Sequence, residues 1–202
     1  MITVYSVLWG DKYPVDYVYR LKSMVQRNLT VPFQFVCITD QEIDGVKCIK
    51  PLVHWHGWWQ KLSLFGVADG PSLYFDLDTV ITGNIDFLVP YTENVLSAPA
   101  NWGQSGHGGI QSSVLAWNGT LKEPFLRFNY DIDSPRLWGD QEYLSELYKD
   151  QFTPIEGVGS YKYHCRGGLP DWCKVVCFHG KPDYPEVNDS WVKKSAFMQT
   201  LA

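Results

Sequence analysis

The sequence predicts an α/β protein: one Rossmann-like domain with a central mixed, mostly parallel sheet flanked by helices. Three observations support this prediction. The 202 residues suit a single domain of ordinary size. Short apolar runs rich in β-branched and aromatic residues alternate with segments of helical periodicity. These runs contain few polar residues, which is typical of parallel strands that are buried on both faces.

The first half of the chain opens in the order β-α-β-β. Thr3–Leu8 is a short apolar run that stops at Gly10 and Asp11, a pair typical of loops. Val15–Gln26 then has apolar residues at helical spacing. The remaining expected elements of this half are strands at Phe33–Ile38, Val46–Ile49 and Pro71–Phe75, and a helix at Gly57–Ala68.

The second half continues with strands and one clear helix. Gly139 and Asp140 mark the start of a helix that we expect to run over Asp140–Tyr148. The stretch 150–171 is rich in Gly and Tyr, and it predicts a long functional loop or lid. Strands are expected at Val95–Ala98, Ile110–Trp117 and Lys174–Phe178.

Composition and charge narrow the classes of function. The net charge is -5 and no block of Lys or Arg stands out, so nucleic-acid binding along a basic face is not expected. A nucleotide ligand stays compatible with this charge, because one metal ion can neutralise a diphosphate locally. No apolar run approaches the roughly 20 residues of a membrane span. Met1–Leu8 is too short and too soon polar for a signal peptide, so we expect a cytoplasmic protein, in the host cytoplasm if it is viral.

The sharpest chemical signal is a pair of carboxylates at the end of a predicted strand. Asp76 and Asp78 follow the apolar run that ends at Phe75. In extended chain, residues two apart point the same way, so both side chains can reach one cation. Ligands of open α/β sheets sit at this carboxyl edge, and hard divalent cations prefer oxygen ligands there. The alternative is a pair of loop aspartates that cap a turn.

Four further motifs stand around this pair in a fixed order. Lys61 lies on the preceding helix, and Gln111-Ser112-Ser113 follows downstream. Asp140-Gln141 opens the next helix, and His179-Gly180-Lys181-Pro182 follows the last strand. In this order the chain resembles the GT-A glycosyltransferases, most closely the retaining, glycogenin-like family 8 enzymes and their small viral or bacterial relatives. Two departures stand out: family 8 has an Asn-Ser-Gly-like turn at 111–113, and its last motif is longer.

The resemblance implies a fold, an activity and a cofactor. We expect one GT-A domain over residues 1–202, with a nucleotide-binding half at about 1–90 and an acceptor half at about 91–202. The activity would be transfer of a hexose from a UDP-sugar, UDP-glucose-like, to a glycan, protein or lipid acceptor. Mn²⁺ would be required, with Mg²⁺ as the alternative, and the anomeric configuration would be retained. The domain would stand alone or form part of a longer multidomain chain.

The resemblance also assigns roles to single residues. Asp76, Asp78 and His179 match the metal ligands, and an imidazole ligand suits Mn²⁺ better than Mg²⁺. Taken alone, His179 would be a core histidine with its hydrogen bonds satisfied. The Gly-Lys-Pro that follows it favours the role of a metal ligand. The residues matched to donor binding are Gly10, Asp11, Tyr13, Asp40, Lys61, Asp76, Leu77, Gln141, Gly180 and Lys181. Those matched to catalysis are Asp140, Gln111 and Lys61.

Within these sets the expected contacts differ. Tyr13 would stack on the base and Asp11 would bind the uracil ring, whereas Lys181 and the Gly180 backbone would hold the diphosphate. Lys61 would pair with Asp76 or with the donor sugar. Three of the matched residues also have an alternative interpretation without a functional role: Asp40 as a turn residue, Asp140 as a helix N-cap and Lys61 as a solvated helix lysine.

Two other functions compete with the transferase. The first is a non-catalytic module that binds a nucleotide sugar and releases nothing. The second is a phosphatase of the haloacid-dehalogenase type, because Asp76-Leu77-Asp78-Thr79 also matches the nucleophile motif of that family. That family carries its motif on the first strand, whereas three predicted strands precede it here. We expect an aromatic group around the cleft, some of whose members contact the acceptor or the sugar: Trp55, His56, Trp58, Trp59 and Trp102.

Overall fold

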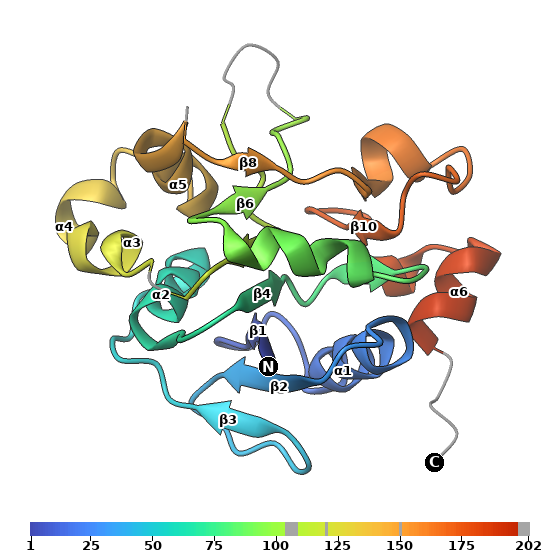
Figure 1. The fold of residues 1–202 in the computed structure, drawn as a ribbon, viewed down its shortest axis with the longest axis horizontal. Helices are drawn as coiled ribbons and strands as arrows, with labels where there is room; N and C mark the ends of the chain where they lie inside the picture. The colour runs from blue at the N-terminus through green and yellow to red at the C-terminus, as the bar shows by residue number, and fades with distance from the viewer. Residues whose placement is uncertain (104–108, 120, 150, 198–202) are drawn as a thin grey trace.

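The molecule is built on one seven-stranded sheet with the strand order β3-β2-β1-β4-β7-β6-β8 (Figure 1). The computed structural model describes residues 1–103, 109–119, 121–149 and 151–197. Strands β1 to β4 run parallel to one another, whereas β7 is antiparallel to both β4 and β6. The predicted mixed, mostly parallel sheet is therefore confirmed. The strands of this sheet are β1 Ile2–Val7, β2 Phe33–Ile38, β3 Lys47–Ile49, β4 Ser72–Phe75, β6 Ser97–Ala98, β7 Val114–Trp117 and β8 Thr153–Pro154.

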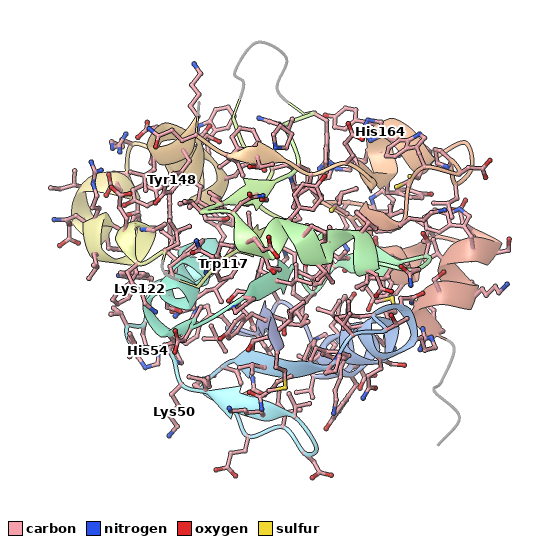
Figure 2. All side chains as sticks on the ribbon, in the orientation of Figure 1. Lys50, His54, Trp117, Lys122, Tyr148 and His164 are labelled. Atoms are coloured by element: carbon pink, nitrogen blue, oxygen red, sulfur yellow. The ribbon has the colours of Figure 1, made fainter. Side chains whose placement is uncertain are left out.

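Alternating side chains of the central strands enter two separate cores. Val4 of β1 packs in one core and Tyr5 in the other, and Leu73 and Tyr74 of β4 divide in the same way. Side chains of a strand alternate between the two faces of the sheet, and both faces are covered, which explains the near-continuous apolar runs of these strands. Trp117 of β7 is fully buried and lies deep inside the molecule in Figure 2, while Lys50, just after β3, is at its edge.

The helices lie in two groups on either side of the sheet. Figure 1 shows α1 and α6 on one side and α2, α3, α4 and α5 on the other. Helix α1 buries Val18, Leu21 and Val25 at helical spacing against the first core. The helices are α1 Asp16–Asn28, α2 Ser63–Val67, α3 Glu123–Arg127, α4 Tyr130–Asp133, α5 Asp140–Tyr148 and α6 Ser190–Phe197, with short 3₁₀ segments η1 Gly57–Leu62, η2 Asp86–Glu93 and η4 Tyr184–Glu186.

A small second sheet carries the end of the chain back to the site. Its strands are β5 Thr79–Ile81, β10 Val175–Cys177 and β9 Val158–Ser160, in the order β5-β10-β9. Strand β5 starts directly after Asp78, and β10 pairs with it antiparallel, Cys177 opposite Thr79. Because β10 ends beside the start of β5, His179 is brought next to the Asp76–Asp78 turn.

Two predicted elements differ from those observed. The stretch 150–171 was predicted as a long loop, but within its described part it holds β8, β9 and a π-helical segment, η3 Tyr161–Cys165. Strand β9 exists through pairing with the distant β10, which no local pattern reveals. The helix predicted over Gly57–Ala68 divides into η1 and α2. The amide of Gln60 bonds to the backbone of Val53 and Trp55 and ties this turn to the preceding loop.

Candidate active site at the strand ends

Asp76 and Asp78 stand at the carboxyl end of β4, where the chain leaves the large sheet for the small one. The Asp76 amide donates to the Ser113 carbonyl, which fixes this end of β4 against β7. Thr79 N donates to the Asp76 carbonyl at 3.2 Å, so the two acids lie within one tight turn. Asp78 is buried, and its Oδ2 accepts a 2.7 Å hydrogen bond from the Tyr13 hydroxyl. Both acids line the same cavity.

The electrostatics of this turn favour a positive partner. Burial raises the pKa of Asp78 well above its ordinary value, and the nearby Asp76 charge raises it further. The Tyr13 hydrogen bond and the Lys12 charge oppose that rise only in part. Burial, and then the Asp78 charge, raise the pKa of Tyr13, so its hydroxyl stays protonated and donates.

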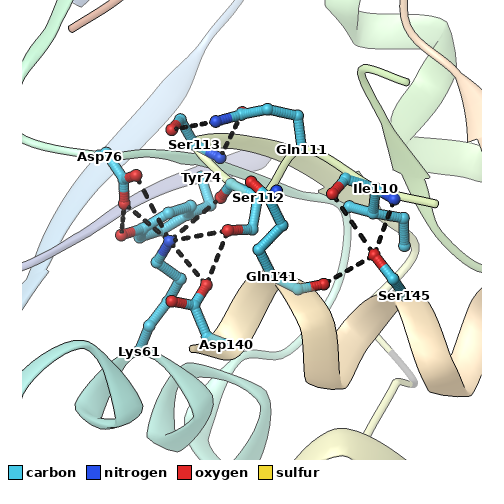
Figure 3. Close-up of polar contacts among 10 residues, drawn as sticks. All are labelled: Lys61, Tyr74, Asp76, Ile110, Gln111, Ser112, Ser113, Asp140, Gln141 and Ser145. Atoms are coloured by element: carbon cyan, nitrogen blue, oxygen red, sulfur yellow. Dashed lines mark hydrogen bonds and ion pairs between the residues drawn. The ribbon is translucent and has the colours of Figure 1, made fainter. Parts of the chain in front are cut away.

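Lys61 joins the carboxylates of two separate elements (Figure 3). Its Nζ lies 3.0 Å from Asp76 Oδ1 and 2.9 Å from Asp140 Oδ2. Ser112 adds a hydroxyl that donates to Asp140 Oδ2 at 2.7 Å, and Tyr74 donates to Asp76 Oδ1 at 2.5 Å. Burial alone lowers the pKa of Lys61, but the two carboxylates outweigh it and the pKa is raised. Lys61 is therefore a buried, charged lysine and no ordinary solvated one.

Asp140 is positioned by the start of α5. It is the first residue of that helix, follows Gly139, and is buried. The interpretation of Asp140 as a helix N-cap is wrong: Gly139 holds the N-cap position without a side-chain cap, and the Asp140 carboxylate instead contacts Lys61 and Ser112. Gln111, also buried, turns its amide onto Ser113: Nε2 donates to Ser113 Oγ and Oε1 accepts from Ser113 N, both at 2.8 Å. This pairing holds the 111–113 turn in place.

His179 follows β10 and is half-buried. Its Nε2 lies 2.6 Å from Ser160 Oγ, and the Tyr163 ring stacks on it with centroids 5.8 Å apart. Burial, and then the Lys162 charge, lower the pKa of His179, so the ring favours its neutral form. In the described part of the chain, no three His, Cys, Asp or Glu side chains are already grouped to hold a metal. The three predicted ligands line one cavity without forming a closed coordination sphere.

The cavity that these residues line has a volume of about 500 Å³. Most of the predicted site residues line it: Tyr13, Lys61, Asp76, Leu77, Asp78, Gln111, Asp140, Gln141 and His179. Some lining residues were missed or given no role from the sequence: Trp9, Lys12, Tyr74, Ser112, Trp138 and Glu142. Of these residues, Trp9 and Trp138 could have been found from the sequence. Trp9 directly follows the first predicted strand, and Trp138 directly precedes Gly139 at the start of a predicted helix.

Five predicted donor-binding residues do not line this cavity: Gly10, Asp11, Asp40, Gly180 and Lys181. Gly10 has a φ of +63° in an exposed turn after β1, which explains the glycine. Asp11 and Asp40 are exposed. Lys181 pairs with Glu186 and its side chain is 78% exposed.

The architecture is the GT-A fold, which solved glycosyltransferase structures share. No protein-family model matches the sequence, and a comparison with curated proteins found no match. Solved structures do match. Glycosyltransferase GlyE of Streptococcus pneumoniae TIGR4 superposes with a TM-score of 0.72 at 17% identity, over 98% of this chain and 60% of that one. The galactosyltransferase LgtC, in a complex with donor and acceptor sugar analogues, gives 0.60 at 16% identity over 91% and 89%.

A third structure agrees. The bifunctional glycosyltransferase WbbM matches with a TM-score of 0.64 at 11% identity, over 90% of this chain and 46% of that one. This chain spans about 60% of the length of the GlyE chain that it matches. At these identities the likeness establishes the fold alone. Within the described ranges, no helix has both the length and the apolar character needed to cross a bilayer.

Proposed function

We propose that this chain is a metal-dependent glycosyltransferase that moves a hexose from a UDP-sugar, UDP-glucose-like, to a glycan acceptor, with retention of the anomeric configuration. One observation carries the proposal. The two strand-end acids and His179 line the same 500 Å³ cavity as the buried Lys61–Asp140 pair. Such a cavity has room for a nucleotide sugar, and it combines groups suited to a cation with groups suited to a sugar.

Asp76, Asp78 and His179 would hold the metal ion. The donor set fits a divalent cation of the Mn²⁺ type, because it offers two carboxylates and a neutral imidazole. The unfavourable proximity of the buried Asp78 and Asp76 supports the fit, since a cation would relieve it. When bound, the ion would supply charge to stabilise the leaving diphosphate. His179 would exchange its contact with Ser160 for the metal.

The donor would occupy the cavity with its base near Tyr13. Tyr13 is half-buried and lines the cavity, and Lys12 lies over its ring at 4.5 Å from the centroid. Leu77 and Gln141 would contact the remainder of the donor, consistent with their place in the lining. On this proposal residues 1–90 mainly bind the nucleotide and residues 91–202 mainly form the acceptor side.

The chemistry at the sugar would fall to the Lys61–Asp140 pair. Breaking the bond to the leaving phosphate builds positive charge at the anomeric carbon, and a buried carboxylate stabilises it without reorganising. Asp140 is suited to this role because Lys61 and Ser112 fix its orientation. Gln111 would act mainly by holding the 111–113 turn, because both ends of its amide are bonded to Ser113.

The acceptor is proposed to be a glycan because two tryptophans flank the cavity. Trp58 is 61% exposed and Trp138 is 76% exposed, and both line the cavity. Trp58 reaches across to Gly139: a Cβ added there would lie 3.2 Å from the indole. Exposed indoles offer flat apolar faces to the C–H faces of sugar rings, so they suit a sugar acceptor better than a polypeptide or lipid chain.

Calorimetric titration of UDP, GDP and CMP, with and without Mn²⁺, tests the proposal. The wild-type chain is expected to bind UDP alone and only with the metal, and Asp78→Ala is expected to lose this binding. Asp86→Ala is the matched control, because Asp86 is an exposed acid that bonds Thr30 outside the cavity. UDP binding that ignores both the metal and Asp78 would contradict the proposal. Release of UDP from UDP-glucose then separates an enzyme from a non-catalytic binding module.

A further inference from the structure

The shortened motif after β10 leaves its lysine outside the cavity. Lys181 comes two residues after His179, with only Gly180 between them. Its ammonium group pairs with Glu186, which belongs to the capping box of η4. Asp183 N donates to the Glu186 carboxylate at 2.9 Å, so this carboxylate is held in place beside Lys181. The lysine that the family motif assigns to the diphosphate is thus directed to a partner on the surface.

A second lysine stands beside the same motif from another segment. Lys162 belongs to η3, the same segment that carries His164, which is labelled in Figure 2. A Cβ added at Gly180 would lie 3.3 Å from Lys162 Nζ, so the ammonium group lies close over the Gly180 backbone. The neighbouring Tyr163 stacks on His179, and Ser160, just before η3, contacts His179 Nε2. Segment η3 therefore packs directly against the predicted metal ligand.

The two lysines that line the cavity, Lys12 and Lys61, already have partners. Lys61 is neutralised by Asp76 and Asp140. Lys12 lies over the Tyr13 ring, at the end of the cavity proposed for the base. Among the residues that the structure describes, no carboxylate forms an ion pair with Lys162.

We infer that Lys162 takes the place of Lys181 and binds the diphosphate of the donor. Transfer turns the doubly charged diphosphate of the donor into a leaving nucleoside diphosphate with further negative charge, more than one divalent cation neutralises, so a second cation beside the ligand set is favourable. Neither lysine lines the cavity itself. Lys162 is partly buried beside the His179 loop and has no carboxylate partner among the described residues, whereas Lys181 is exposed and would first have to leave Glu186. The open conformation of Gly180, with φ of +69° and no side chain, lets the Lys162 ammonium group approach the loop.

The inference rests on the proposed function, and titration of UDP and UMP with saturating Mn²⁺ tests it. Lys162→Met is expected to weaken UDP binding about 10- to 100-fold, the loss typical of one charge-assisted hydrogen bond. UMP, which lacks the second phosphate, is expected to lose less than about threefold. Lys181→Met tests the competing assignment, and it should change UDP binding less than about threefold because the side chain is exposed and pairs with Glu186. Lys162→Arg should restore UDP binding to within about fivefold of wild type.

Other outcomes overturn the inference in distinguishable ways. A loss of UDP binding in Lys181→Met with none in Lys162→Met would return the role to Lys181. Equal losses for UMP and UDP in Lys162→Met, with no rescue by arginine, would make Lys162 a structural residue. In both cases the proposed function stands if wild type binds UDP with Mn²⁺ and Asp78→Ala does not. If wild type binds no UDP, the proposed function falls and the role of Lys162 falls with it.

Discussion

Lys61 Nζ lies 2.9 Å from Asp140 Oδ2, joining η1 to the first residue of α5 across the cavity. Both side chains are more than nine-tenths buried, and a second carboxylate, Asp76, reaches the same ammonium group from β4. Three segments far apart in the sequence therefore meet at one buried charge. A buried ion pair adds little net stability compared with apolar residues, but removing one partner leaves the other charge buried and unpaired.

Lys61→Met is expected to lower the free energy of unfolding by about 3 kcal/mol, because it leaves Asp140 and Asp76 without their cation. Urea unfolding followed by circular dichroism measures the change. The double variant Lys61→Met/Asp140→Asn should recover part of the loss. Lys47→Met, at an exposed lysine that bonds Gln34, serves as the control and should leave the midpoint unchanged. An unchanged midpoint in Lys61→Met would mean that the pair is solvated.

Asp140→Asn tests the proposed catalytic role. The change keeps the shape of the side chain and removes the charge that would face the anomeric carbon. Release of UDP from the donor is expected to slow about 100-fold, as when a preorganised electrostatic group is removed, while UDP affinity stays within about threefold. Asp133→Asn is the control, a buried acid that pairs with Arg136 outside the cavity. An Asp140→Asn enzyme with wild-type turnover would remove Asp140 from the mechanism.

Trp58→Ala and Trp138→Ala test the glycan acceptor. Each is expected to raise the KM for a glycan acceptor about tenfold, which corresponds to the loss of one stacking contact. The KM for the donor should stay within about twofold. Trp172→Ala is a matched control, because Trp172 is 50% exposed but does not line the cavity. A parallel rise in the donor KM would instead indicate that the two indoles shape the donor pocket.

Gly119→Ala tests the packing that brings β4 and β7 together. Gly119 has a φ of +85°, and an added Cβ would lie 2.1 Å from the Gly70 carbonyl oxygen. We expect the free energy of unfolding to fall by about 3 kcal/mol or more, because backbone must move. Gly45→Ala, with a φ of +66° and open space around it, should cost only about 1 kcal/mol. Equal losses in the two variants would show that φ alone, and not the contact, constrains Gly119.

Much of the fold could be predicted from local sequence because its central strands are continuous apolar runs. Strand β2 and helix α5 have the predicted bounds, Phe33–Ile38 and Asp140–Tyr148. Strands β5 and β9 were not predicted, since each has three residues and is defined by pairing with β10. Short strands of this kind carry too little periodicity to be detected without their partners.

The residues of the site also fall into those that local sequence predicts and those that only the tertiary structure places. The sequence by itself determined the α/β class with a mostly parallel sheet and the strand-end pair Asp76 and Asp78, because burial of apolar runs and the edge of a parallel sheet follow from local pattern, whereas the GT-A fold was implied by the resemblance of five ordered motifs. Only the tertiary structure decided that Lys61 is shared by two carboxylates and that Lys181 is paired with Glu186. It alone brought Lys162 beside Gly180. Contacts between segments distant in sequence depend on how the elements pack, and local sequence patterns do not reveal which distant segments come close in space.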